Sequence, residues 1–127
     1  MNHANLESVE IQGELTQVSD SAFENGTALK QITFTKKVGS VGNQAFSNCT
    51  ALETVEMSDG VTSIGNNAFA ACGSLQYIMF PKTVTTVGTK LVTDFTSLLA
   101  VRYTGTEDEW NASDFKTQEF SGTKVYY

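Results

Sequence analysis

The chain has 127 residues, of which 40% are hydrophobic, and its 14 acidic and 8 basic side chains give a formal net charge of −6. This length fits one domain, and the negative charge repels the phosphates of nucleic acids and anionic lipids. No stretch approaches the roughly 18 consecutive apolar residues of a membrane-spanning helix, so the composition argues against nucleic-acid binding and against membrane insertion.

A 23-residue repeat runs through the sequence. Leucine recurs at this interval from Leu6, and each copy is followed by apolar residues three and five positions later. Such a period is typical of repeat proteins in which neighbouring units share one core. Four apolar columns follow it: Leu6, Leu29, Leu52, Leu75 and Leu98; Leu15, Val38, Val61 and Val84; Val18, Val41, Ile64 and Val87, with Trp110 in the same register; and Phe23, Phe46, Phe69, Val92 and Phe115.

Each repeat contains two stretches of alternating apolar residues, which predict two short strands per unit. A tight helical turn is expected around residues 45–46 and 68–69. Stacked at about 4.8 Å per turn, the units would form parallel ladders around one continuous core. A glycine follows the third column in three repeats (Gly42, Gly65 and Gly88), which predicts a corner where the backbone has a positive φ or approaches a neighbour closely.

The sequence therefore predicts a short right-handed repeat solenoid of the α/β class, mainly β, in a single domain over residues 1–127. Because the pattern already begins at Leu6, and the residues ahead of it lack the basic and apolar regions of a secretory signal, we favour a chain whose leader has been removed over a cytosolic protein. The expected units are residues 6–28, 29–51, 52–74 and 75–97, followed by a C-terminal strand and cap at 98–127.

The C-terminal segment departs from the repeat. Residues 106–109 have the form of a capping box, which predicts that a helix begins there. Trp110 and Phe115, in the third and fourth columns, would then cover the open end of the core. Residues 124–127 predict a last strand, in which either tyrosine could follow Tyr103 in the ladder.

Two cysteines, Cys49 and Cys72, occupy the same position in adjacent repeats. Stacked Cα atoms about 5 Å apart would permit a disulfide. Parallel Cβ directions, and the presence of Gly26 and Phe95 at the same position in other repeats, favour two buried thiols instead. Two cysteines without neighbouring histidines are too few for a zinc site.

The sequence offers little for catalysis. His3 is the only histidine and lies near the end of the chain, so a base-assisted nucleophile is not expected. The acidic run at 107–109 could contribute to a calcium site, but calcium needs more oxygen ligands from a spaced loop, and the capping box explains the same residues. We expect no catalytic residue, no metal ion and no cofactor.

The face of the first predicted sheet is the best candidate for a binding site. If the apolar residues of each first strand point inward, the residues between them form two outward columns, which are mostly small or polar. The exceptions are an aromatic residue and a methionine flanked by charged and polar neighbours, as in contact patches. The alternative is ordinary exposure of apolar side chains. The candidate ligand-binding residues are Thr54, Glu56, Tyr77, Met79 and Arg102.

The repeated unit resembles the BspA-like leucine-rich repeat, also described as the LRR_5 type. The resemblance rests on the pattern Leu-x-x-Ile-x-Phe, then Val-x-x-Ile/Val-Gly-x-x-Ala-Phe-x-x-Cys, and on an ending similar to residues 103–111 of this chain. It covers residues 6 to 127. The resemblance implies a secreted or cell-surface protein, commonly bacterial, whose repeats serve adhesion or recognition.

From this resemblance we expect a non-enzymatic module that binds a protein or glycan, with host surface and matrix molecules among the candidate ligands. The alternative is a structural spacer, a fragment of a longer repeat array with no ligand of its own. The sequence leaves the ligand, the organism and the oligomeric state open.

Overall fold

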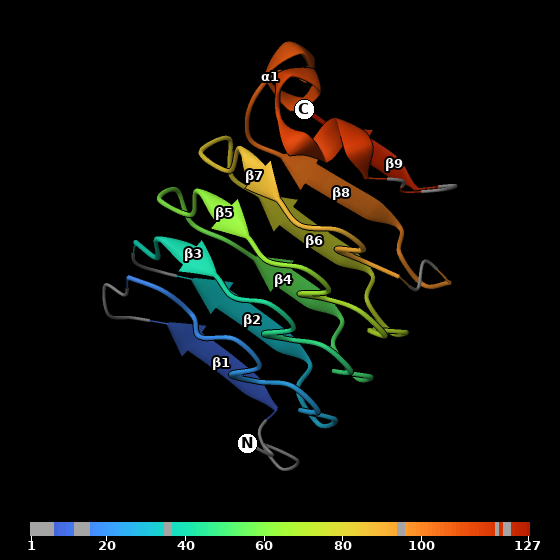
Figure 1. The fold of residues 1–127 in the computed structure, drawn as a ribbon. Helices are drawn as coiled ribbons and strands as arrows, with labels where there is room; N and C mark the ends of the chain where they lie inside the picture. Colours follow the sequence, from blue (N-terminus) through green and yellow to red (C-terminus); the bar gives the residue numbers. More distant parts are fainter. Residues whose placement is uncertain (1–6, 12–15, 35–36, 94–95, 119, 121–122) are drawn as a thin grey trace.

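The structure is a computed structural model, and it describes residues 7–11, 16–34, 37–93, 96–118, 120 and 123–127. The described chain coils into a solenoid with two parallel sheets (Figure 1). One sheet has six strands, in the order β1 (Ser8–Ile11), β2 (Gln31–Phe34), β4 (Thr54–Glu56), β6 (Tyr77–Phe80), β8 (Ala100–Tyr103) and β9 (Lys124–Tyr126). The other has three very short strands, β3 (Ser40–Val41), β5 (Ser63–Ile64) and β7 (Thr86–Val87).

The pairing register confirms the repeat. In the six-stranded sheet Val55 of β4 lies beside Ile32 of β2 and Ile78 of β6, each 23 residues away. In the three-stranded sheet Ile64 lies beside Val41 and Val87 at the same interval. Like residues therefore stack on like residues, as the apolar columns predict. The boundaries of the individual units stay a prediction.

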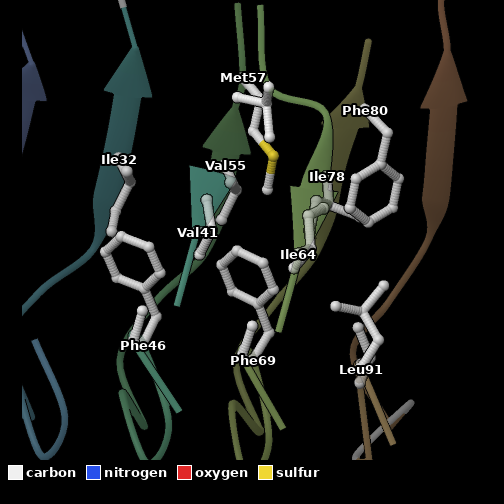
Figure 2. Packing of buried hydrophobic residues seen from close by; sticks show 14 of the residues in the cluster. Ile32, Val41, Phe46, Val55, Met57, Ile64, Phe69, Ile78, Phe80 and Leu91 are labelled. Atoms are coloured by element: carbon white, nitrogen blue, oxygen red, sulfur yellow. The ribbon is translucent and has the colours of Figure 1, made fainter. Parts of the chain in front are cut away.

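The core lies between the two sheets. Phe23, Phe46 and Phe69 stack in successive turns, with ring centroids 5.3 Å apart and rings nearly parallel. Figure 2 shows Phe46 and Phe69 beneath the apolar side chains of the strands. Phe46 and Phe69 are fully buried, as are Val55 and Ile78 of the first sheet. Burial of such side chains stabilises each by about 1.5–3 kcal/mol relative to exposure, and no single turn could achieve it alone.

The tight turn predicted after each second strand is present, but it is not helical. Residues 43–48 form a run of turns without helix, and Gln44 and Asn48 in that run have positive φ angles of 56° and 60°. The N–H groups of Gln44, Phe46 and Asn48 donate to carbonyls of the following repeat at 2.7–2.9 Å. One local bond, from the Ser47 N–H to the Gln44 carbonyl at 3.1 Å, closes the turn. The remaining N–H groups bond to the neighbouring turn instead of continuing a helix, because the stack offers acceptors that an isolated segment lacks.

The glycine column is explained by close approach, the second of the two reasons expected. A Cβ atom added to Gly65 would lie 2.4 Å from Oδ1 and 2.5 Å from the backbone nitrogen of Asn43. Gly42 and Gly88 meet the corresponding atoms of Asp20 and Asn66 at similar distances. Because it lacks a Cβ, each glycine allows its turn to pack closely against the Asp or Asn at the corner of the preceding turn.

The C-terminal cap begins as predicted. Helix α1 (Glu107–Ala112) starts with a capping box, in which Thr106 Oγ1 accepts from the Glu109 N–H and the Glu109 carboxylate accepts from the Thr106 N–H. The short 3₁₀ helix η1 (Asp114–Thr117) follows it. No helix in the described part of the chain has the length and apolar character needed to cross a membrane.

Trp110 and Phe115 cover the end of the core, as expected, but they do not continue the third and fourth columns. Both are buried, and their rings stack at 4.6 Å. The residue beside Val87 is Asp114, whose Oδ2 accepts from the Val87 N–H, and Gln118 occupies the corresponding place beside Leu91. The offset is 27 residues rather than 23, because helix α1 adds residues between β8 and Asp114.

The last strand forms as predicted, and the structure shows which of its two tyrosines follows Tyr103. In β9 Val125 lies beside Val101 and Tyr126 lies beside Arg102, so Tyr126 continues an outward column. Tyr127 is the tyrosine near Tyr103, with the two rings 6.4 Å apart. Tyr126 therefore belongs to the surface of the sheet, where its side chain is 46% exposed.

Both cysteines are free and buried, in agreement with the thiol alternative. Each thiol donates to a carbonyl of the preceding turn: Cys49 Sγ to Phe23 O and Cys72 Sγ to Phe46 O, both at 3.3 Å. Each thiol fills a small buried space and donates to one backbone carbonyl. Packing therefore explains why both positions hold cysteine.

Candidate binding surface

The outward residues of the six-stranded sheet form two rows that cross all its strands. The strands alternate between buried and more exposed residues, so every second side chain faces away from the core. Pairing across the sheet aligns these side chains from strand to strand. The first row is Ser8, Gln31, Thr54, Tyr77, Ala100 and Lys124, and the second row is Glu10, Thr33, Glu56, Met79, Arg102 and Tyr126.

The five residues that the sequence singled out lie together on this face. Tyr77 lies beside Thr54 in the first row, and Met79 lies between Glu56 and Arg102 in the second. Glu56 is exposed, and the other four are half-buried. Half-buried side chains keep part of their surface available while their neighbours restrict their rotamers, which lowers the entropic cost of a contact.

Sequence reasoning missed two residues of the same surface, Lys124 and Tyr126. Strand β9 brings them beside Ala100 and Arg102, and the Lys124 ammonium lies 5.1 Å from the centroid of the Tyr126 ring. This distance is within the range of a cation–π contact. The alternation Lys124-Val125-Tyr126 was the available signal, but it lacks the leucine and isoleucine that mark the other strands.

The charges on this face are separated. Glu10 and Glu56 lie in the β1–β4 part of the second row, whereas Arg102 and Lys124 lie on β8 and β9. Arg102 Nη1 donates to the carbonyl of Tyr103 at 3.3 Å, which holds the guanidinium in place and leaves other donors free. In the described part of the chain neither Arg102 nor Lys124 forms an ion pair.

A second concave surface lies over the three-stranded sheet. It is a shallow groove of about 340 Å³, and its lining includes Gly65 together with Asp20, Asn43 and Asn66. Oδ1 of Asp20, of Asn43 and of Asn66 each accepts at 2.8 Å from the backbone N–H 23 residues later. This ladder, which we call the Asx ladder, holds the turns together, so the polar lining of the groove has a structural explanation.

The residues considered for catalysis or metal binding have structural roles or lie outside the described part of the chain. His3 lies outside the described residues. Burial raises the pKa of the Cys49 thiol to about 11, so this cysteine stays protonated and a poor nucleophile at neutral pH. Glu109, within the acidic run once weighed as a calcium site, is engaged in the capping box. No group of three His, Cys, Asp or Glu side chains in the described ranges could hold a metal ion.

Comparison with known proteins identifies the repeat. The model of the BspA type leucine rich repeat region matches residues 1–121 in six copies. A search of curated proteins gives no match.

Three solved structures share the fold. A leucine rich cell surface protein from Faecalibacterium prausnitzii is 24% identical over 89% of this chain, with a TM-score of 0.71. A leucine-rich repeat protein from Bacteroides ovatus is 21% identical over 98% of this chain, also with a TM-score of 0.71. The leucine rich repeat protein of T. pallidum is 25% identical over 76% of this chain, with a TM-score of 0.64 and 58% of its own length covered. The chain spans only 34% and 37% of the first two proteins.

Proposed function

The chain belongs to the BspA-type leucine-rich-repeat family, and we infer that it is a non-enzymatic module that binds a protein or a glycan through the outward face of the six-stranded sheet. The family predicted from the repeat pattern is thus confirmed. The ligand-binding role is our proposal, and it rests on the surface of the sheet.

The observation that carries the proposal is a change in residue type along the outward rows, from β6 to β9. On β2 and β4 the outward residues are polar or charged, as a solvated sheet requires: Gln31, Thr33, Thr54 and Glu56. On the following strands Tyr77, Met79, Arg102 and Tyr126 take their places. Because the repeat needs no particular residue at an outward position, stacking does not account for this change. Tyrosine, methionine and arginine are enriched in the cores of protein interfaces.

We also propose that the module acts at the cell surface or after secretion. The support for this location is that the structurally similar protein from Faecalibacterium prausnitzii is a cell surface protein. A protease-accessibility experiment on intact cells of the source organism tests this location. The module should be digested without cell lysis, and protection until lysis would contradict the proposal.

The experiment that tests binding uses the double variant Tyr77→Ser/Met79→Ser. The purified chain is titrated against immobilised host matrix proteins and glycans, and the variant should bind at least about tenfold more weakly to whichever ligand the native chain binds. Thr86→Ser, an exposed position on β7, is the matched control and should leave affinity unchanged. Circular dichroism must show an intact fold in both variants.

The competing function, a structural spacer, predicts a different result. A spacer has no ligand of its own, so the native chain would bind nothing saturably across the panel. Equal affinity of the folded native chain and the double variant would also contradict the proposed surface.

A further inference from the structure

The β8–β9 end of the sheet face differs in charge from the β1–β4 end, and the difference restricts which ligand fits. Although the whole chain carries a net charge of −6, the two ionised side chains that face outward on β8 and β9 are both cationic, Arg102 and Lys124. A ligand with negative charge at this end and none near Glu10 and Glu56 would match both parts of the face. Such complementarity chiefly sets orientation and association rate.

The two cations are available for a ligand. As described above, neither forms an ion pair with a described carboxylate. Arg102 is held by the Tyr103 carbonyl, and Lys124 lies over the ring of Tyr126. Both are therefore positioned by neutral partners, which leaves their charge uncompensated. A carboxylate that reached them would form charge-assisted hydrogen bonds, which are roughly twice as strong as neutral ones.

A short side chain lies between the long ones at this end. In the first row Ala100 stands between Tyr77 and Lys124, and Arg102 follows two residues later on the same strand. Because Ala100 ends at Cβ, a ligand side chain can approach the sheet closely at this point with an aromatic ring on one side and an ammonium group on the other. A carboxylate on a short aliphatic stem has the shape and charge that these neighbours recognise.

We propose that the occupant of this face is an acidic segment of a polypeptide, with an aspartate or glutamate side chain over Ala100 between Lys124 and Arg102. This inference rests on the proposed function and specifies its ligand. A polypeptide is favoured over an acidic polysaccharide because Met79 lies beside Arg102, and the flexible thioether packs well against the apolar side chains that accompany acids in a protein segment.

The test uses a random peptide library displayed on phage, selected on the native chain and on Arg102→Glu/Lys124→Glu. Peptides selected on the native chain should be enriched in aspartate and glutamate, and those selected on the variant should not. A selected acidic peptide, measured by fluorescence anisotropy, should bind the variant at least about tenfold more weakly. Its affinity for the native chain should also fall as salt is raised from roughly 0.05 to 0.5 M, because added ions screen exposed charges.

A matched control separates local charge from net charge. Lys90→Glu/Lys116→Glu makes the same change in net charge at two exposed lysines outside both outward rows. It should change the affinity of the acidic peptide by less than about twofold, since neither lysine is part of the face that the peptide contacts and exposed charges at a distance are screened by salt. An equal loss in both double variants would overturn the inference.

The inference and the proposed function fail in different ways. If selected peptides require Tyr77 and Met79 but show no acidic enrichment, the binding surface stands and the acidic partner is overturned. If a hyaluronan oligosaccharide binds the native chain more tightly than any selected peptide, the polypeptide assignment is overturned. If no peptide or panel ligand binds the folded native chain, the proposed function fails as well.

Discussion

Oδ1 of Asn43 accepts a 2.8 Å hydrogen bond from the backbone N–H of Asn66, the equivalent residue one turn later. Asn66 repeats the contact with the N–H of Thr89 at the same distance. A side-chain acceptor is needed here because the N–H group at each corner lies outside the strands of both sheets. The Asx ladder therefore contributes stability that apolar packing alone does not supply.

Substitution of Asn66 tests the ladder. Asn66→Ala should lower the free energy of unfolding by about 1 kcal/mol, the usual net value of one hydrogen bond, because water can replace the lost acceptor at this exposed corner. Asn66→Asp is the matched control, since Asp20 fills the same role in the first turn. Urea denaturation measures both, and a loss in Asn66→Asp as large as in Asn66→Ala would show that the acceptor is unimportant.

Gly65 should tolerate no side chain. Gly65→Ala places Cβ against the backbone nitrogen of Asn43 as well as its Oδ1, so the turns must separate, and we expect a loss of about 2–3 kcal/mol in thermal or urea unfolding. The double variant Gly65→Ala/Asn43→Ala removes the Asn43 side chain. It should not regain stability, because the added Cβ still clashes with the Asn43 backbone nitrogen. Recovery in the double variant would assign the clash to the Asn43 side chain alone.

Ala71 offers a route to greater stability. It has a φ of 58°, a left-handed conformation that costs an ordinary L-residue roughly 1–2 kcal/mol, whereas Asn25 and Asn48 occupy the same position in earlier turns. Ala71→Asn should therefore stabilise the protein by about 0.5–1 kcal/mol. The amide introduced at this position should also donate to Asn48 Oδ1, in the same way that Asn48 Nδ2 donates to Asn25 Oδ1 at 2.7 Å.

Differential scanning calorimetry measures this gain. The adjacent Ala70→Asn provides the control, because Ala70 is not among the residues with positive φ and should show no increase in melting temperature. Equal melting temperatures for Ala71→Asn and the native protein would mean that the left-handed conformation carries no strain here.

The Cys49 thiol makes stability depend on pH under alkaline conditions. Burial raises its pKa from 9.0 to about 11, so the unfolded state releases the proton at lower pH than the folded state. The stabilising effect is complete below pH 9 and is lost as the pH rises towards about 11. Between pH 9 and about 11, the melting temperature should fall less steeply with pH in Cys49→Ala than in the native protein. Equal slopes would show that the Cys49 thiol does not cause the pH dependence.

The apolar columns predicted the solenoid well because the strands of one turn and the next bury the same residue types. Ile32, Val55 and Ile78 stack as their spacing requires, and the polar residues between them face outward. What the sequence could not show was which backbone groups pair between turns. The N–H of Phe46 bonds to the Ala68 carbonyl, and this bond, which exists only in the stack, keeps the predicted turn from being helical.

The cap and the candidate surface were harder to predict for a related reason. The 23-residue period places Trp110 after Val87, but helix α1 adds residues to the chain, and Asp114 lies beside Val87 instead. The same irregular stretch hides the register of β9, which places Tyr126 beside Arg102 on the surface. Periodicity predicts positions within the repeats, and it fails once a segment of different geometry intervenes.

The backbone hydrogen bonds of the stacked phenylalanines all run in one direction, so the two ends of this column differ in chemistry. The N–H groups of Phe23, Phe46 and Phe69 all donate towards the C-terminal neighbour. At the C-terminal end the cap supplies side-chain acceptors to the last turn, with Gln118 Oε1 receiving the N–H of Leu91 and Asp114 Oδ2 receiving that of Val87. Two C-terminal ends of this phenylalanine column would face each other donor to donor, whereas a C-terminal and an N-terminal end would pair donor with acceptor.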